Sequence, residues 1–294
     1  MSRVVNLTDQ QSALSRLHEM RDHGGVAETR GLTDETILDF LEDRQDLATA
    51  IERGYDAFLA LSESHADFLA LDEREQILLS QDGLTNFYRP ESVNPYVAIA
   101  AAGPWIVTLK GAVVYDCGGY GMLGLGHVPE AVLDAMNKPH VMANVMTPSQ
   151  SQFDLTERLK EEIGHRRASG FPYDSFICLN SGSEAMTVAS RIADINTRKL
   201  TDPGGRYEGR RACGLSLAGS FHGRTERPAR FSDSTRAKYR EHLASFRRRG
   251  YLFTVEPNDI QGLEEIFANA DAEGVFIEAF FLEPVMGEGN PGLA

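Results

Sequence analysis

The sequence contains few cysteines and no long apolar run. Cys117, Cys178 and Cys213 lie far apart, and no two of them form a C-x-x-C pair. This spacing excludes a cysteine-based zinc site or disulfide framework, and it favours a reducing, cytoplasmic location. No apolar stretch approaches the roughly 20 residues of a membrane helix, and residues 1–10 lack the apolar core of a signal peptide. We therefore expect a cytoplasmic protein without a metal site or a membrane-spanning segment.

Positive charge is also scarce. The 294 residues include 29 Lys and Arg against 43 Asp and Glu, which gives a net charge of −14. A surface that binds nucleic acid or an anionic membrane needs net positive patches, so the sequence predicts neither partner. The length corresponds to roughly two domains of about 150 residues. With 42% hydrophobic and 24% charged residues, the composition is that of an ordinary globular protein.

The negative charge is concentrated toward the N-terminus. Residues 1–90 contain 18 acidic and 8 basic side chains, a net charge of −10. Apolar residues in this segment recur with helical spacing, as at Ile51, Tyr55 and Phe58. We predict that residues 1–86 form an acidic helical N-terminal extension that packs on the main domain and has a solvated charged face. Docking of a partner or regulation is the alternative role.

After residue 90 the sequence alternates between short apolar runs and amphipathic stretches. The predicted strands are a hairpin over 105–108 and 112–115, followed by 176–179, 214–218, 251–255 and 275–282. The predicted helices are 129–136, 153–163, 184–199 and 259–270. Alternation of this kind predicts an α/β domain with a mostly parallel sheet.

One glycine motif imitates a dinucleotide site. Gly119, Gly121 and Gly124 match the pattern G-x-G-x-x-G. A dinucleotide site needs a helix that begins within the glycines, but the predicted helix begins only at Pro129. Residues 139–146 also contain no acid that could bind the ribose. A nicotinamide-linked oxidoreductase is therefore only a distant alternative.

The segment 180–185 is the first of three that favour specific chemistry. It follows the predicted strand 176–179 and opens the next helix. Gly182 would let a ligand approach the backbone closely, and Ser183 is positioned to cap the helix. A capping hydroxyl and the first helical amides form an anion site suited to a phosphate group. A plain serine cap without a ligand explains the same residues, so this segment alone does not distinguish a phosphate site from an ordinary helix cap.

The second and third segments also follow predicted strands. Phe221, after strand 214–218, could stack on a flat ring, or it could belong to the core with His222 as a turn residue. Glu283 ends the apolar run 275–282, and a carboxylate in that position needs a partner; a surface turn is the alternative. Because ligand crevices of parallel sheets lie at the carboxyl ends of strands, both segments are candidate site loops.

The order and spacing of the three segments are more specific than any one of them. Together they resemble the class III aminotransferases, the pyridoxal-phosphate enzymes of fold type I. Asn180–Ala185 resembles the family's phosphate cup, Phe221–Thr225 its aromatic-His-Gly-Arg-Thr segment, and Glu283–Gly289 its Glu-Pro-x-x-Gly-Glu segment. Tyr115–His127 is similar to the family's early glycine-rich stretch. The resemblance begins at about Phe87 and leaves the acidic helices outside it.

The resemblance implies an organisation for the whole chain. It implies the large domain of a fold type I transferase, with a mostly parallel sheet flanked by helices, truncated and preceded by the acidic helical extension. Residues 1–86 would be that extension, and residues 87–140 would form the N-terminal part of the small domain with the substrate mouth. Residues 141–294 would form an incomplete pyridoxal-phosphate-binding large domain.

The resemblance also implies pyridoxal 5'-phosphate as the cofactor. It assigns cofactor contacts to seven residues, Ser181, Gly182, Ser183, Phe221, His222, Gly223 and Glu283. Gly182 and Ser183 would hold the phosphate, Phe221 would stack on the pyridine ring, and Glu283 would lie near that ring. Glu288 would lie at the substrate mouth.

No catalytic residue is assigned within the chain. In the family, a lysine that forms a Schiff base with the cofactor and an aspartate that pairs with the pyridine nitrogen both follow the Glu-Pro-x-x-Gly-Glu segment. None of the five lysines lies in such a position: Lys110, Lys138, Lys160, Lys199 and Lys238. We therefore expect the Schiff-base lysine beyond Ala294, and we expect this chain to be a fragment that cannot transaminate alone.

The resemblance favours an aminotransferase that moves an amino group from an amino acid or amine to a 2-oxo acid. An aminomutase, decarboxylase or racemase of the same fold is an alternative. A catalytically inactive pseudo-enzyme that acts as an assembly partner is a further alternative, and the acidic extension is compatible with it. The resemblance also implies a homodimer.

Overall fold

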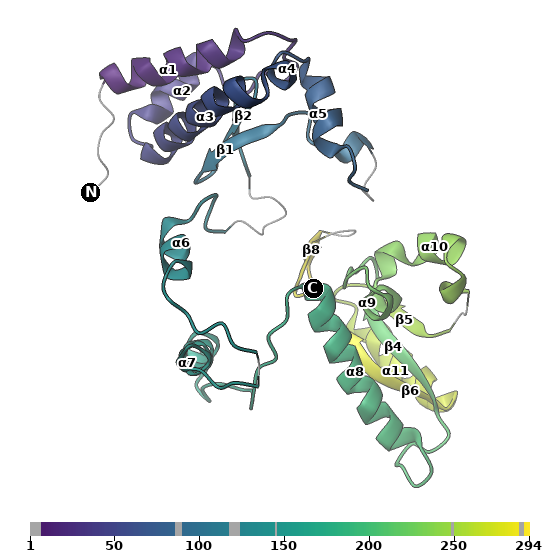
Figure 1. The fold of residues 1–294 in the computed structure, drawn as a ribbon. Helices are drawn as coiled ribbons and strands as arrows, with labels where there is room; N and C mark the ends of the chain where they lie inside the picture. Colours follow the sequence, from purple (N-terminus) through teal and green to yellow (C-terminus); the bar gives the residue numbers. More distant parts are fainter. Residues whose placement is uncertain (1–6, 86–89, 118–123, 145, 248–249, 288–290) are drawn as a thin grey trace. The chain divides into compact units, whose positions relative to one another are not determined.

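The computed structural model divides the chain into two compact units, Met1–Thr147 and Pro148–Ala294. Figure 1 draws both units. The residues that the structure describes are 7–85, 90–117, 124–144, 146–247, 250–287 and 291–294. None of the helices in these ranges has the length and apolar character needed to span a bilayer.

The first unit combines helices with a small antiparallel sheet. Its helices are α1 (Leu7–Arg21), α2 (Asp34–Leu41), α3 (Gln45–Ser64), α4 (Ala66–Leu69), α5 (Glu73–Gln81) and, after the sheet, α6 (Glu130–Met136). A short 3-10 turn, Pro90–Ser92, precedes β1 (Ala98–Ala102), β2 (Trp105–Thr108) and β3 (Val113–Tyr115). The strands pair in the order β1-β2-β3, so the predicted hairpin over 105–115 is confirmed.

The helices and the sheet of the first unit share one core. Helix α3 packs on β1 and β2 (Figure 1). Leu17 of α1, Ile51 of α3 and Trp105 of β2 are fully buried in the same cluster. The predicted helices of residues 1–86 are therefore present. They are continuous in packing with strands that follow residue 97, and the compact units divide only after Thr147.

A buried lysine joins three backbone segments of this unit. Lys110 is 2% exposed. Its Nζ donates hydrogen bonds to the carbonyl oxygens of Gly24 at 2.7 Å, Leu71 at 2.6 Å and Leu69 at 3.2 Å. Burial lowers the pKa of Lys110, although the charges of nearby carboxylates oppose that shift. All three ammonium donors are occupied, so this side chain ties the β2–β3 turn to the loops that flank α1 and α4.

The second unit is built around a parallel sheet. Its helices are α7 (Gln150–Gly164), α8 (Gly182–Thr201), α9 (Glu226–Phe231), α10 (Asp233–His242) and α11 (Ile260–Ala272), with a 3-10 turn at Ala244–Phe246. Its strands are β4 (Arg211–Leu217), β5 (Leu252–Val255), β6 (Val275–Phe281), β7 (Val285–Met286) and β8 (Gly292–Leu293). Strands β5, β4 and β6 pair in parallel in that order.

The helices of this unit pack on the sheet as an α/β domain requires. Helix α8 contacts β6 and α9, and α11 contacts β5 and β6 (Figure 1). Leu215, Leu217 and Val255 are buried between these layers. Parallel strands place their carboxyl ends at one edge, and this edge receives the loops that follow β4 and β6. The predicted parallel α/β arrangement is confirmed.

The strand predicted over 176–179 is wrong. These residues form no strand, and no described strand pairs with them. Ile177 is 63% exposed and Leu179 is 42% exposed. An apolar run becomes a strand only where a neighbouring edge accepts its backbone hydrogen bonds, and none of the described strands does so for residues 176–179.

We predict that Lys110→Met destabilises the first unit. The substitution keeps an apolar stem but leaves three carbonyl oxygens without their donor, which we expect to cost about 3 kcal/mol of unfolding free energy. Chemical denaturation followed by the fluorescence of Trp105 measures the effect. Lys138→Met, at an exposed position of the same unit, is the matched control and should change stability by less than about 0.5 kcal/mol. Equal stability of the two variants would contradict the role of Lys110.

Candidate functional site

The three predicted segments meet at one cavity in the second unit. The cavity has a volume of about 600 Å³ and lies where β4 and β6 end and α8 begins. Its lining residues are Ser181, Gly182, Ser183, Met186, Phe221, His222, Gly223, Leu282, Glu283, Pro284 and Val285. All seven residues predicted to contact the cofactor are among them. Their individual roles as cofactor contacts stay predictions.

Helix α8 begins two residues earlier than predicted. The helix begins at Gly182, and its cap is Ser181, whose Oγ accepts the Glu184 N–H at 3.2 Å. The predicted cap, Ser183, is wrong because the helix begins two residues earlier than expected, which places Ser183 inside its first turn. An N-cap hydroxyl bonds to an amide two or three residues further on, and Ser181 meets that requirement.

Ser183 instead joins the helix to the second segment. Its Oγ accepts the backbone N–H of Arg224 at 3.3 Å. One turn later, the hydroxyls of Thr187 and Thr225 lie 3.3 Å apart. The first turn of α8 is therefore fixed to the loop that carries Phe221, and these two sides of the cavity keep a defined spacing.

Two glycines line the cavity, and the protein's own structure requires glycine at only one of the two positions. Gly223 has φ +127°, and a Cβ there would lie 2.5 Å from Ser183 Oγ, so the backbone and the packing both exclude a side chain. At Gly182, by contrast, a Cβ would meet no heavy atom of the described residues within 4 Å, and φ is not positive. The protein's own described atoms therefore do not require glycine at 182, and its open surface is available to a ligand.

The third segment supports the second through a carboxylate. Glu283 Oε2 accepts the backbone N–H of Phe221 at 2.7 Å, and its Oε1 accepts the N–H of Gly287 at 3.4 Å. Hydrogen bonds to an ionised acceptor are stronger than those between neutral groups. A carboxylate at the end of an apolar strand needs a partner, and Glu283 finds it in the backbone of the neighbouring loop.

The Phe221 side chain forms a wall of the cavity. Its ring is half-buried, and the guanidinium carbon of Arg224 lies 5.3 Å from the ring centroid. A cation at this distance is attracted by the aromatic ring. With its backbone held by Glu283 and its ring in contact with Arg224, Phe221 has a defined position beside the cavity.

His222 is the buried titratable group of the site. It is 8% exposed, and its backbone N–H donates to Ser232 Oγ at 2.9 Å. Its ring Nε2 is buried and has no hydrogen-bond partner in the described part of the chain. Burial lowers the pKa of His222, and the charge of Glu283 opposes that shift. The imidazole is therefore held in its neutral form at neutral pH.

Ser232 was not singled out in the sequence. Ser232 Oγ lies within hydrogen-bond distance of the carbonyl oxygens of Gly223 and Pro228, besides accepting from His222. Ser232 lies ten residues after His222 and holds the loop that carries it. No sequence motif marks Ser232. Glu288, predicted at the substrate mouth, lies outside the described residues.

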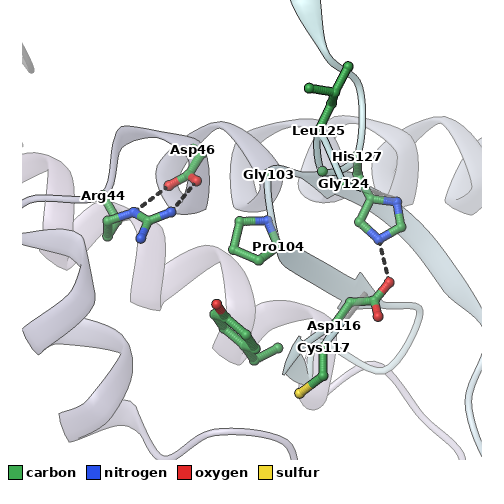
Figure 2. A pocket seen from close by; sticks show the side chains of 11 residues that line it. Arg44, Asp46, Gly103, Pro104, Asp116, Cys117, Gly124, Leu125 and His127 are labelled. Atoms are coloured by element: carbon green, nitrogen blue, oxygen red, sulfur yellow. Dashed lines mark hydrogen bonds and ion pairs between the residues drawn. The ribbon is translucent and has the colours of Figure 1, made fainter. Parts of the chain in front are cut away.

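The glycine-rich segment belongs to the first unit. Gly119 and Gly121 of the G-x-G-x-x-G match lie outside the described residues, and α6 begins only at Glu130. The described end of the segment lines a separate cavity of about 580 Å³ (Figure 2). There His127 Nε2 lies 2.9 Å from Asp116 Oδ2. The predicted place of this segment near a substrate entrance stays a prediction.

We predict that His222 makes the protein less stable at acid pH. Its pKa in the folded state lies below the ordinary value of 6.5. The unfolded chain therefore binds the proton more readily, and stability present above about pH 6.5 is lost as the pH falls below it. His222→Gln should remove up to about 1.4 kcal/mol per pH unit from the slope of unfolding free energy between pH 6.5 and 5.

The measurement is denaturant unfolding across that pH range. His165→Gln, at an exposed position of the same unit, is the control and should keep the slope of the original chain. A His222→Gln variant with an unchanged slope would show that the imidazole is not held neutral by burial.

Comparisons with known proteins identify the family of the chain. The family model for class III aminotransferases matches residues 87–291. A glutamate-1-semialdehyde 2,1-aminomutase from Methanocorpusculum labreanum is 29% identical over 222 residues, which cover 72% of this chain and 47% of that protein. The aminotransferase PigE from a Serratia species is 28% identical over 201 residues, which cover 65% of this chain and 20% of that protein.

Solved structures share the fold. An ornithine aminotransferase from Toxoplasma gondii, whose active site is described as partly occupied by PLP, matches with a TM-score of 0.58 and 20% identity. The match covers 76% of this chain and 48% of that one. An aminotransferase from Bacillus anthracis matches with a TM-score of 0.51 and 18% identity, over 72% of this chain and 48% of that one.

The chain spans about half the length of these solved structures and half or less of the curated relatives. The family match nevertheless covers more than half of the chain and includes all three segments at the cavity. Family membership implies pyridoxal 5'-phosphate as the cofactor. The chain belongs to the class III aminotransferase family and has the fold type I architecture of the pyridoxal-phosphate-dependent aminotransferases.

Proposed function

We propose that this chain provides the phosphate- and ring-binding part of a pyridoxal-phosphate site. The protein to which the site belongs would transfer an amino group from an amino acid or amine to a 2-oxo acid. The observation that carries the proposal is the cavity of about 600 Å³ at which the phosphate-cup, aromatic and Glu-Pro segments meet. Its size falls in the range of small-molecule sites.

The phosphate end of the proposed site is the first turn of α8. The helix has 20 residues, so its N-terminus carries the partial positive charge of a full macrodipole. The first amides of a helix have no carbonyl partner within it, and they suit an anion such as phosphate. Gly182 leaves its side-chain position open, which supports close approach of that group.

The ring end of the proposed site is formed by Phe221 and by apolar residues after β6. Phe221 would stack on the pyridine ring, because its loop is held by Glu283 and lines the cavity. Leu282, Pro284 and Val285 line the same cavity and would exclude water from the face of the ring. His222, neutral and buried, would add no positive charge beside that face.

The bound cofactor supplies an electron-withdrawing ring that stabilises negative charge at a substrate carbon. The residues of this chain bind and orient it. No lysine is among the described lining residues of the cavity, so these residues offer no amine for covalent attachment of the cofactor. We therefore propose that the chain by itself binds the cofactor reversibly and does not complete an amino transfer.

An aminomutase is the second candidate function. Several curated relatives are named glutamate-1-semialdehyde 2,1-aminomutases, at 26% to 29% identity. Such an enzyme moves the amino group within one molecule and needs no 2-oxo acid acceptor. Turnover of an amino donor by the full-length protein only when a 2-oxo acid is added would favour the aminotransferase.

We also propose that the full-length protein is a cytoplasmic homodimer. The scarcity of cysteine supports the location, and the family resemblance supports the dimer. Residues 1–86 would be an accessory acidic segment, residues 87–140 the substrate mouth and the start of the small domain, and residues 141–294 the cofactor-binding domain.

We predict that Gly182→Ala weakens cofactor binding without loss of stability. The new methyl group would project into open space, where the phosphate is expected, and should raise the dissociation constant for pyridoxal phosphate about tenfold. Equilibrium dialysis measures the affinity, and thermal unfolding measures the stability. Lys199→Ala, near the far end of the same helix, should leave both unchanged. Unaltered affinity in Gly182→Ala would place the phosphate elsewhere.

We also predict that binding to this chain is not covalent. After incubation with one equivalent of pyridoxal phosphate and reduction with borohydride, peptide mass spectrometry should find no stoichiometric adduct at any lysine. A stoichiometric adduct on one of the five lysines would contradict the proposal that none of them holds the cofactor covalently.

A further inference from the structure

A second cavity of the Pro148–Ala294 unit lies away from the candidate cofactor site. It has a volume of about 320 Å³ and is lined by Arg211, at the start of β4, and by Tyr251, just before β5. The cofactor cavity lies at the other end of these parallel strands. Strand β4 has seven residues. At about 3.3 Å per residue, the amino and carboxyl ends of the strand are separated by roughly 20 Å.

Two arginines line the cavity, in a chain that is negative overall. Arg211 and Arg230 line it, and no acidic residue is among its described lining residues. Arg211 donates a hydrogen bond to the carbonyl oxygen of Gly250 and makes no ion pair with any described residue. Arg230 pairs with Glu226 at 2.6 Å, but both side chains are exposed, 45% and 66%, so solvent screens that pair.

Two buried polar atoms of this region have no partner among the described residues. The hydroxyl of Tyr251 is buried and has no partner among the described residues. The guanidinium carbon of Arg240 lies 6.0 Å from the centroid of the Tyr251 ring, and its Nε is likewise buried and unpartnered among those residues. Buried polar groups are nearly always hydrogen-bonded in folded proteins, and Tyr251, which carries one of these two atoms, lines the cavity.

Aromatic surface completes the lining. Phe246 is 3% exposed, and its ring contacts that of Tyr239 at a centroid distance of 5.2 Å. Phe246, Tyr251 and the hydroxyl-bearing Ser245 all line the cavity. Guanidinium groups bind phosphate with two parallel hydrogen bonds, and aromatic rings pack on flat organic groups.

We propose that this cavity binds a small organic phosphate monoester. Arg211 binds the phosphate, Arg230 adds positive charge, and the ring of Tyr251 contacts the organic group. The proposal does not rest on the proposed cofactor site, because the two cavities share no lining residue.

The test uses phenyl phosphate and a residue-specific readout. Phenylglyoxal modifies accessible arginines, and peptide mass spectrometry measures the rate at each one. Phenyl phosphate should slow modification of Arg211 several-fold and leave Arg198, an exposed arginine of α8, unaffected. Inorganic phosphate should protect Arg211 only at higher concentration. Unchanged modification of Arg211, or equal protection by both compounds, would overturn the proposal.

Calorimetric titration of variants provides a second readout. Arg211→Gln should weaken the binding of phenyl phosphate about tenfold or more, and Arg211→Lys, which keeps the charge without the planar fork, should have intermediate affinity. Arg198→Gln is the matched control and should bind as the original chain does. Thermal unfolding checks that each variant is folded. Equal affinity in a folded Arg211→Gln variant would contradict the assignment.

Discussion

The candidate site depends on one hydrogen bond between two loops. The carboxylate of Glu283 accepts the backbone N–H of Phe221 at 2.7 Å. This contact fixes the aromatic wall of the cavity and gives a partner to a carboxylate that follows an apolar strand. Without it, both groups would need other partners, and the aromatic wall would lose the contact that the third segment makes with it.

The sheet makes that contact possible. Strands β4 and β6 are parallel neighbours, and Ser216 of β4 pairs with Phe281 of β6. Phe221 and Glu283 follow these paired positions at the same edge, which brings the two loops together. Helix α8 adds the third side, because Ser183 binds the backbone of Arg224. Three segments that are distant in sequence thus surround one cavity through a parallel register and two hydrogen bonds.

The sequence predicted the features that have a local signal. Strand and helix alternation predicted the parallel sheet, and strand-end loops with glycine, aromatic and acidic residues predicted which segments meet. The local pattern placed the cap at Ser183, whereas the helix begins earlier and Ser181 caps it. The apolar run 176–179 imitated a strand because its pattern reports hydrophobicity and contains no information about a pairing edge.

Features that rest on distant contacts could not be predicted. Lys110 bonds to carbonyl oxygens up to 86 residues away in sequence, and Ser232 supports the His222 loop from a segment without a motif. The core shared by the N-terminal helices and the β1–β3 sheet also consists of contacts between residues that are distant in sequence. The acidic composition marked those helices as distinct, but composition does not report which surface they bury.

Amide hydrogen exchange of Phe221 tests the account most directly. The account predicts that this amide is protected in the original chain without any ligand, and that Glu283→Ala removes the protection while the amides of strand β4 stay protected. Unprotected exchange at Phe221 in the original chain would contradict the claim that Glu283 holds the aromatic wall of the site.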